Sequence, residues 1–581
     1  MKQWGMRACA LMVTCGVMTG VAQAATYTSV QYGVWDNPAT WGAASYPGPN
    51  DTAIINSEVH IEDPTTVQNL TVNPAGLFVM SGDLVINGGN LTVNGDMYVI
   101  GNEISFVNGA DLIVSSPADF DASYGSLRFA SGSCTMSGPA SPSLSIENMY
   151  VDTGSTLTVS TIDWVIESYL YPAGAILGKS PRYGAVGELD YVAGGNYIVG
   201  AEWTPGMVDP PLTYIDNNTS VAFSVPDGVY DCYGVIIYAG STLSLGSSDL
   251  DAMFFGLVNY GTFNQGARRV RIHDTGNLNN YGTYNYGTGT VLFQDNSWAQ
   301  GQMDGDVIVY DLVVDGNLAR SFGTLTIVHS ATVKNPDGFL QCDTPAYYQP
   351  GAKLTFENFT GNDHGSDWAT DRPTTSLGAP TEVRFTSSSL TTYSDPTLVC
   401  DRLYIDSSST LNIDEGYLYI NELLEVAPGG NIITGFFGGY QLPPYVTYGL
   451  LINGLGSYSF PHTNVTMNFT AIPPGGCGVS VGMNPVSYPG APAGIQTGKW
   501  WNIVTSGACT ANITLPTTHL GFGSNPYVCH YNTGSGTWDY GRTSSTFTTV
   551  TRNGVSTFSP FAAGDQNLGP VPVSVSAFDA E

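Results

Sequence analysis

The segment 268–274, Arg-Arg-Val-Arg-Ile-His-Asp, concentrates side chains that are rare in this chain. It holds three of only 17 Lys and Arg residues. On a β-strand, Arg269, Arg271 and His273 share one face, whereas the two apolar residues between them point inward. Such a row of cations suits an anionic polysaccharide, and an arginine in it can take the proton beside a uronate carboxylate, as in a polysaccharide lyase. The alternative is an exposed stripe that neutralises acids on neighbouring strands.

Two tyrosines that follow this segment, Tyr281 and Tyr284, carry aromatic rings of the kind that stack on sugars. With Arg269, Arg271 and His273 they make up the predicted ligand-binding set. Tyrosines that recur along a regular β structure also stack on one another, and this ordinary packing is the alternative interpretation.

The segment 363–371 is the candidate metal site. Its carboxylates, Asp363, Asp367 and Asp371, could place oxygen ligands around Ca²⁺, which binds six to eight oxygens. The segment lacks the Asp-x-Asp-x-Asp-Gly spacing with a late Glu, so a polar loop is the alternative. Calcium is the one cofactor that the sequence suggests.

Sequence motifs of known catalysis are missing. We find no Gly-x-Ser-x-Gly elbow, no phosphate-binding glycine loop and no His-Glu-x-x-His. A carboxylate pair for glycoside hydrolysis stays open, because the sequence does not show how far apart two acids lie in space. No catalytic residue is therefore assigned.

The cysteines are scattered and do not form a disulfide framework. Seven of the nine lie beyond residue 24, and an odd number favours no complete pairing. No Cys-x-x-Cys or Cys/His spacing suits zinc. The candidate disulfide joins Cys509 and Cys529, the pair closest in sequence beyond residue 24, with Cys477 in the same region.

Internal repeats predict the structure that carries these residues. Short alternating strands such as Asn69-Leu-Thr-Val and Asn90-Leu-Thr-Val recur over 69–114. The hexapeptide Asn259-Tyr-Gly-Thr-Phe-Asn264 returns 21 residues later as Asn280-Tyr-Gly-Thr-Tyr-Asn285. Three strands of about seven residues make one turn of a three-sided parallel β-helix.

A longer period runs above the coil. A Thr-Leu-x-apolar strand begins at Thr156, Thr242, Thr324 and Thr410, at spacings of 82 to 86 residues. We therefore predict an all-β chain in which residues 51–455 form a right-handed parallel β-helix with four super-repeats of about 84 residues, or about 19 coils.

The flanking segments read differently. Residues 25–50, with Trp35 and Trp41, predict a cap over the first coil, since an open coil exposes an unpaired edge. Residues 456–567 contain strands separated by turns, which is typical of an antiparallel β-sandwich. Residues 568–581 read as a linker with an incomplete terminal strand.

The first 24 residues are predicted to be a secretory signal peptide. Lys2 and Arg7 precede an apolar run over 8–21, and Ala22-Gln-Ala24 fits a signal-peptidase site. The run is shorter than the ~20 residues that span a bilayer, and no later segment replaces it, so no transmembrane segment is predicted.

Charge limits the partners of the chain. Lys and Arg total 17 against 48 Asp and Glu, and the formal net charge is −31. This balance argues against nucleic-acid binding, which needs clustered cations. A surface glycan or a second copy of the chain, in a filament or surface layer, is the predicted partner.

The order of these motifs resembles a known group of proteins. The pattern Gly33-x-Trp…Trp41 with Pro47-Gly-Pro-Asn-Asp51 resembles the start of bacterial surface β-helix proteins. The segments 458–461, 499–503, 531–538 and 558–561 resemble the sandwich that follows such β-helices in proteins exported by the type IX route. Val571-Pro-Val-Ser574 resembles the linker to their sorting domain. No such domain follows before Glu581, so we expect that the chain is either truncated before it or anchored another way. The resemblance implies a Gram-negative cell-surface location and an adhesive or coat function, and it carries over no catalytic residue.

Three functions follow as hypotheses. The first is a non-enzymatic extracellular stalk, adhesin or filament subunit, because repetition spreads function over a surface. The alternative is a secreted polysaccharide-binding or polysaccharide-lyase protein, which would gather Arg269, Arg271, His273 and several acids in one groove. A calcium-dependent surface-layer component is the third.

Overall fold

A computed structural model describes residues 24–565, apart from gaps at 117, 142, 208, 224, 274, 295–300, 316–318, 335–339, 343–345, 364–377, 393–396, 442–444, 487, 490, 492–498, 519 and 521–524. The described part of the chain is all-β, with about 61% of its residues in strands. The described part contains one short 3₁₀ helix, η1 (Pro38–Trp41), and no α-helix.

Parallel strands stack into a β-solenoid of about 16 turns with about 21 residues per coil. The predicted period is therefore confirmed, whereas the expected number of about 19 coils is too high. The excess arises because some segments leave the coil. For example, the described residues between β20 (Gly195–Ile198) and β21 (Leu212–Ile215) form no strand.

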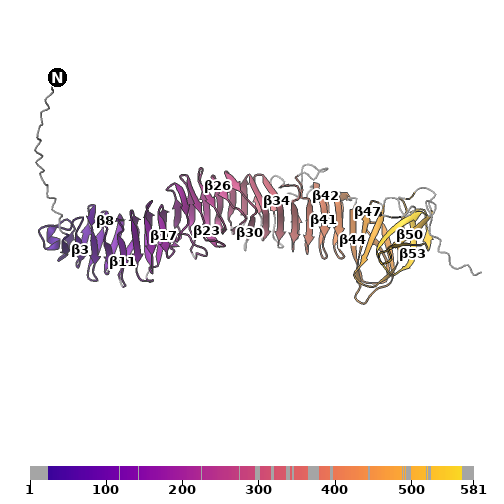
Figure 1. Cartoon of the computed structure of the whole chain (residues 1–581), viewed down its shortest axis with the longest axis horizontal. Coiled ribbons are helices and arrows are strands. Elements are labelled where there is room, and N and C mark those ends of the chain that lie inside the picture. Colours follow the sequence, from indigo (N-terminus) through magenta and orange to yellow (C-terminus); the bar gives the residue numbers. More distant parts are fainter. Residues whose placement is uncertain are drawn as a thin grey trace, which may run out of the picture. The chain divides into compact units, whose positions relative to one another are not determined.

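The chain divides into two compact units, residues 1–189 with 200–202 and residues 190–199 with 203–581. Figure 1 shows parallel strands following one another in each unit. One sheet of the first unit lists β1 (Thr26–Thr28), β3 (Thr52–Ile55), β6 (Asn69–Val72), β9 (Asn90–Val93), β11 (Asp111–Val114), β13 (Ser133–Ser137), β15 (Thr156–Val159) and β17 (Ala175–Gly178). The equivalent sheet of the second unit lists β20, β22 (Thr219–Ala222), β24 (Thr242–Ser244), β26 (Thr262–Asn264) and β29 (Thr283–Asn285).

Other strands, many of them longer, form the other faces of the coils. In the first unit these include β10 (Asp96–Val107), β12 (Phe120–Phe129), β14 (Leu144–Val151) and β16 (Trp164–Pro172). In the second unit they include β23 (Val229–Ile237), β25 (Asp249–Asn259), β27 (Val270–His273), β28 (Asn277–Asn280), β30 (Thr290–Gln294), β32 (Val307–Asp315), β34 (Leu325–Lys334), β37 (Lys353–Glu357), β39 (Glu382–Thr386), β41 (Thr397–Ile405), β42 (Thr410–Val426) and β43 (Asn431–Gln441).

Alternation along each strand builds the interior. In β6 and β9 every second residue is buried. Leu70 pairs with Leu91 and Leu91 with Leu112, so equivalent leucines stack from coil to coil, fully buried. A change of register by one residue would turn all of these side chains to solvent, so the alternation specifies the pairing.

Several residues of the repeated hexapeptide make contacts between coils that explain why they recur. Asn259 is buried, and its Nδ2 donates to Asn280 Oδ1 at 2.8 Å. Asn285 Nδ2 donates to Asn264 Oδ1 at 2.7 Å on the outside. A Cβ at Gly282 would lie 2.2 Å from the carbonyl oxygen of Gly261, so only glycine fits between these coils.

The N-terminal segment 25–50 is partly a coil itself. Strand β1 pairs in parallel with β3, and β2 (Gly33–Val34) pairs with β4 (Val59–Ile61). Trp35 and Trp41 are buried with their rings 5.0 Å apart, and Trp41 Nε1 donates to the carbonyl of Trp35 at 2.7 Å. This tryptophan pair packs against Phe78 of the coil interior.

The pairing changes from parallel to antiparallel at β44 (Tyr445–Ile452), close to the predicted boundary at 455. Strand β44 pairs in parallel with β42 and antiparallel with β47 (Cys477–Asn484). The same sheet continues through β48 (Trp500–Thr505), β54 (Pro560–Asp565), β50 (Pro526–Asn532) and β51 (Thr537–Gly541). A second antiparallel sheet consists, in spatial order, of β45 (Gly456–Phe460), β46 (Val465–Ala471), β49 (Thr510–Pro516), β53 (Thr549–Val555) and β52 (Ser544–Ser545).

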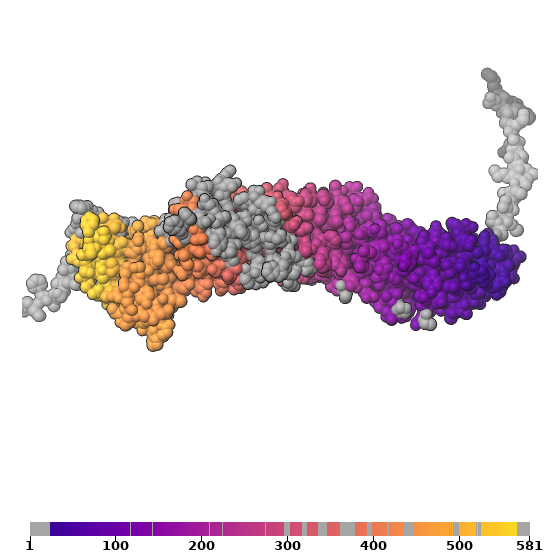
Figure 2. Space-filling model, turned by 180° about the vertical axis from the view of Figure 1, so that it is seen from behind, coloured from indigo at the N-terminus to yellow at the C-terminus, as the bar shows by residue number. Residues whose placement is uncertain are grey.

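Both antiparallel sheets contribute to one buried cluster. Val479 and Trp501 of the first sheet and Met467 and Ile513 of the second belong to it, and all four are fully buried. Figure 2 shows the residues of this region, in orange and yellow, lying together at the C-terminal end of the second unit.

Candidate functional site

The basic segment lies on β27, which pairs with β25 of the preceding coil and β30 of the next. Val270 and Ile272 are buried in the coil, whereas Arg271 and His273 are partly exposed. The predicted inward and outward faces of this strand are therefore confirmed. Arg269 directly precedes the strand.

Each cation of the segment meets an acid of an earlier coil. Arg271 lies opposite Asp251 of β25 and donates from Nε to its Oδ2 at 2.7 Å. His273 Nε2 contacts the other oxygen, Oδ1, of the same carboxylate. Arg269 pairs with Asp249, with 3.5 Å between Nη2 and Oδ2. Arg269 and Arg271 thus link neighbouring coils through ion pairs.

Asp251 is the centre of this cluster and is only 1% exposed. Burial by itself would raise the pKa of Asp251, but hydrogen bonds from His273 and Arg271 outweigh it and hold the pKa below its usual value. On the coil before, burial and then the charge of Asp251 raise the pKa of Asp231. Two carboxylates with opposite pKa shifts are the pattern of an acid and a base. Asp251, however, is covered and held by the side chains of Arg271 and His273, so a substrate cannot reach it.

The tyrosine candidates lie on opposite sides of the coil wall. Tyr281 is 49% exposed and stacks on Tyr260 at 5.2 Å, which in turn stacks on Tyr238 at 6.4 Å. Tyr281 also donates to Asp304 Oδ2 at 2.6 Å, and this hydrogen bond, followed by burial, raises its pKa to about 12. Because stacking covers ring faces, the ladder presents mainly ring edges to solvent.

Tyr284 points into the coil and is not a surface residue. It is 9% exposed, lies 5.3 Å from the ring of Phe263 and donates to Gln265 Oε1 at 2.5 Å. A sugar on the outer surface cannot stack on this ring, so the placement corrects the interpretation of Tyr284 as a ligand-binding residue.

The candidate calcium site falls mostly outside the described residues. Asp367 and Asp371 lie there, and only the backbone of Asp363, at the end of β38 (Thr360–Asp363), is described. Within the ranges that the structure does describe, no group of three or more His, Cys, Asp or Glu side chains is placed to hold a metal ion. Calcium binding by this segment stays a prediction.

Cys509 and Cys529, the candidate disulfide, are both free and belong to different clusters. Cys509 lies with Cys477 in the cluster shared by the two antiparallel sheets. Cys529 of β50 belongs with Ala562 to a smaller cluster, while Val528 beside it points into the shared one. Neighbouring strand residues face opposite sides of a sheet, so the sheet itself separates the two thiols.

An aromatic group that the sequence analysis did not single out lies beside this smaller cluster. The ring of Tyr488 is 5.0 Å from Trp500, 5.2 Å from Tyr531 and 5.3 Å from Trp538. The Nε1 of Trp500 is buried and has no hydrogen-bond partner among the described residues. The adjacent tryptophans at 500 and 501 were the available signal, because one of two neighbouring strand residues must face outward.

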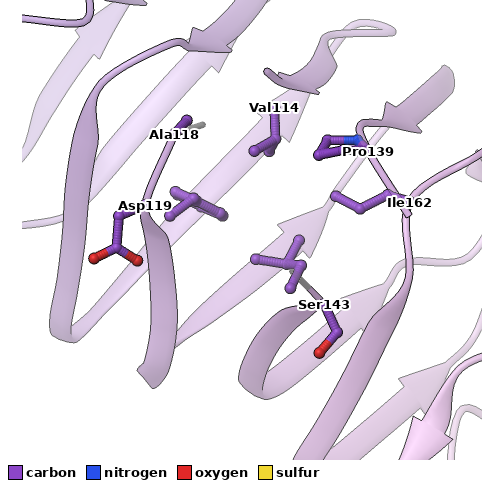
Figure 3. A pocket seen from close by; sticks show the side chains of 8 residues that line it. Val114, Ala118, Asp119, Pro139, Ser143 and Ile162 are labelled. Carbon is purple, nitrogen blue, oxygen red and sulfur yellow. The ribbon is translucent and has the colours of Figure 1, made fainter. Parts of the chain in front are cut away.

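A small cavity of about 80 Å³ opens in the first unit between coils. Val114, Pro139 and Ile162 face it, whereas the carboxylate of Asp119 and the hydroxyl of Ser143 lie at its edge (Figure 3). A space of this size is large enough to hold several ordered waters.

Comparison of the chain with known protein families, with curated proteins and with solved structures finds no match. No helix among the described residues is long and apolar enough to span a membrane.

Proposed function

We propose that this chain is a non-enzymatic structural and adhesive protein of the surface of a Gram-negative bacterium. The observation that carries the proposal is the use of its rare cations. Arg269 and Arg271 bind acids of the preceding coil, and Asp251 is nearly inaccessible between Arg271 and His273. Residues that suggested a polysaccharide site therefore have a structural role as links between coils.

The finer architecture belongs to the same proposal. The solenoid is a right-handed parallel β-helix, and the two antiparallel sheets pack face to face as a β-sandwich. Their common buried cluster supports this packing, as does the hydrogen bond of 3.0 Å from Trp501 Nε1, on the first sheet, to the carbonyl of Thr463 beside the second. The resemblance to type IX surface proteins and the signal-like residues 1–24 support export.

Export is tested by expressing the full chain in a Gram-negative host that has the type IX route. We expect the N-terminus of the product to begin at Ala25, and protease added to intact cells to degrade the chain. A variant with Arg7→Glu and Leu11→Arg, which breaks the charged start and the apolar run, serves as the control and should stay inside with residues 1–24 attached. Wild-type chain that keeps residues 1–24 and resists protease until the cells are lysed would contradict export.

Self-association is tested separately by negative-stain electron microscopy of purified residues 25–581, with and without Ca²⁺. Fibres or ordered sheets support a structural subunit that uses a second copy as its partner. Isolated particles under both conditions exclude unaided assembly and leave adhesion to a surface glycan, which a glycan array then examines.

A polysaccharide-binding function is the second candidate, and the aromatic group favours it. Trp500, Tyr531 and Trp538 carry large rings on the outer side of an antiparallel sheet, where they pack around Tyr488. Binding of a glycan that is lost in Trp538→Ala and kept in Phe547→Ala would support it. Phe547 is a suitable control because it is 80% exposed.

A further inference from the structure

Two buried cysteines meet where the two antiparallel sheets join. Cys477 begins β47, and Cys509 lies just before β49 in the other sheet. Their exposed fractions are 5% and 4%, and both belong to the shared buried cluster. The thiol of Cys509 is in hydrogen-bond contact with the thiol of Cys477. Both are in the reduced form in this structure.

The backbone brings these residues together independently of the thiol contact. Val479 of β47 lies opposite Thr505 of β48, and Ser506 N donates to the carbonyl of Gly478 at 2.9 Å. Continuing this antiparallel register places Cys477 opposite Gly507. A Cβ built on Gly507 would lie 3.7 Å from the Cβ of Cys477, the separation usual between cross-linked cysteines.

Cys509 follows Gly507 by two residues, which span at most ~7 Å of chain. The thiols of Cys509 and Cys477 are in contact, so the two side chains already point toward each other, as a disulfide requires. Ile452, on the other side of Cys477, pairs with it through β44 and fixes that strand end. Cys477 thus lies on backbone that a β ladder holds in place, and Cys509 directly precedes Thr510, which pairs with Ala471 of β46.

We propose that Cys477 and Cys509 form a disulfide bond in the exported protein and so link its two antiparallel sheets. Each thiol loses one proton and one electron, and an S–S bond forms between the two Sγ atoms. The oxidant is a disulfide, either of a thiol oxidase or of oxidised glutathione, whose own S–S bond breaks and accepts the two electrons and two protons.

The bond forms before the core closes. In the folded chain, burial and then the neighbouring Cys477 raise the pKa of Cys509 to about 11, although a hydrogen bond from Thr505 lowers it. A protonated thiol reacts slowly, since the thiolate is the nucleophile. Oxidation during folding is therefore expected to be faster than oxidation of the native dithiol.

The experiment uses the mature chain, residues 25–581, refolded once with oxidised glutathione and once with dithiothreitol. Each sample is denatured, alkylated and digested without reduction, and the peptides are identified by mass spectrometry. In the oxidised sample we expect a peptide that links Cys477 to Cys509, and five alkylated cysteines of the seven beyond residue 24. In the reduced sample all seven should be alkylated.

Two variants sharpen the test. Cys529→Ala leaves the pair intact and should keep the cross-link, whereas Cys509→Ala should leave Cys477 alkylated. Circular dichroism that shows retained β structure in both variants separates loss of the bond from loss of the fold. Alkylation of both Cys477 and Cys509 after oxidative refolding of wild-type chain overturns the proposal, and so does a bond from Cys509 to Cys529. Because the oxidant is supplied, neither result depends on whether the chain is exported or adhesive.

Discussion

Asp251 is the charged residue on which the basic segment depends. It is 1% exposed, and both of its oxygens are used, one by Arg271 and one by His273. A buried carboxylate that loses its partner is costly, because nothing then replaces the water it gave up. The free energy of unfolding should therefore respond to Arg271 far more than to the neighbouring arginine.

Arg271→Ala is predicted to lower the free energy of unfolding of the second unit by about 2 kcal/mol, which is less than a fully buried pair would lose because the Arg271 side chain is 34% exposed. Arg269→Ala is the control. Its partner Asp249 is more exposed and 3.5 Å away, so the loss should stay below about 1 kcal/mol. Urea unfolding measures both. Equal losses would show that Asp251 does not depend on Arg271, and Asp251→Asn in the Arg271→Ala background should restore part of the loss.

His530 makes the C-terminal region sensitive to acid. It is 5% exposed and stacks on Phe561 at 4.6 Å; the groups facing it are Asp539, 3.5 Å from Nδ1, and Arg552, which binds Asp539. Burial lowers its pKa below 6.5, although Asp539 partly opposes the shift. The unfolded chain therefore takes up the proton more readily, and stability falls as the pH drops through 6.5 until it passes the folded pKa.

His530→Gln is predicted to reduce this loss. We expect the thermal midpoint of the wild type to fall more between pH 7 and pH 5 than that of the variant, as measured by circular dichroism. His329→Gln is the control, since His329 is 51% exposed. Parallel pH profiles for wild type and His530→Gln would show that His530 does not cause the loss of stability in acid.

At the level of the coil, the buried asparagine ladder consists of Asn259 and Asn280, whose side chains form a hydrogen bond between two coils. Asn280 accepts from Asn259 and donates from Nδ2 to the carbonyl of Asp306 at 2.7 Å. Asn285 occupies the last position of the same repeat but lies outside, where it donates to Asn264. The two asparagines therefore allow a matched comparison of a buried and an exposed amide within one hexapeptide.

Asn280→Ala is predicted to lower the free energy of unfolding by about 1–3 kcal/mol, because it removes the acceptor Oδ1 of the buried Asn259 amide and the donor to the part-buried carbonyl of Asp306. Asn285→Ala should cost less than about 1 kcal/mol, since water replaces the lost hydrogen bond. Chemical unfolding of the two variants measures the difference. If Asn285→Ala were the more damaging substitution, the inner ladder would not be what joins these coils.

The sequence predicted the coil but not which side chains face inward at each corner. The 21-residue shift of the hexapeptide predicted the length of one coil, because strand residues of the first copy pair with the same positions of the second copy on the next coil. The buried position of Tyr284 was available from the same comparison, since Phe263 stands at the equivalent place and a phenylalanine there indicates the interior. The acids Asp249 and Asp251 were also within reach, about one coil before Arg269 and Arg271.

Other features had no local signal. Cys509 and Cys529 are the closest pair in sequence beyond residue 24, but proximity along the chain does not show which face of a sheet a residue occupies. Cys477 is the actual neighbour of Cys509. The number of coils was overestimated for a related reason, because segments that leave the coil have the same strand-like composition as those that stay in it.

For the whole molecule, we propose that the repeated coils have a structural role and that their charged side chains hold neighbouring coils together. The chain's 17 Lys and Arg residues are few, and several of them form ion pairs between coils, as at Arg128, which binds Glu103 and Asp152 in the first unit. The same arrangement recurs in the second unit at Arg384, which binds Asp406. Charged side chains that form ion pairs with neighbouring coils are not free to bind a substrate.

The central claim, that the basic segment is structural and not catalytic, is tested most directly by assaying the mature chain for uronate-lyase activity. Purified residues 25–581 and the variant Arg271→Gln are incubated with a panel of polyuronates, and the unsaturated product is followed by its ultraviolet absorbance. The account predicts no product from either protein. Product formed by the wild type and lost in folded Arg271→Gln would contradict it and would establish the segment as the site of a polysaccharide lyase.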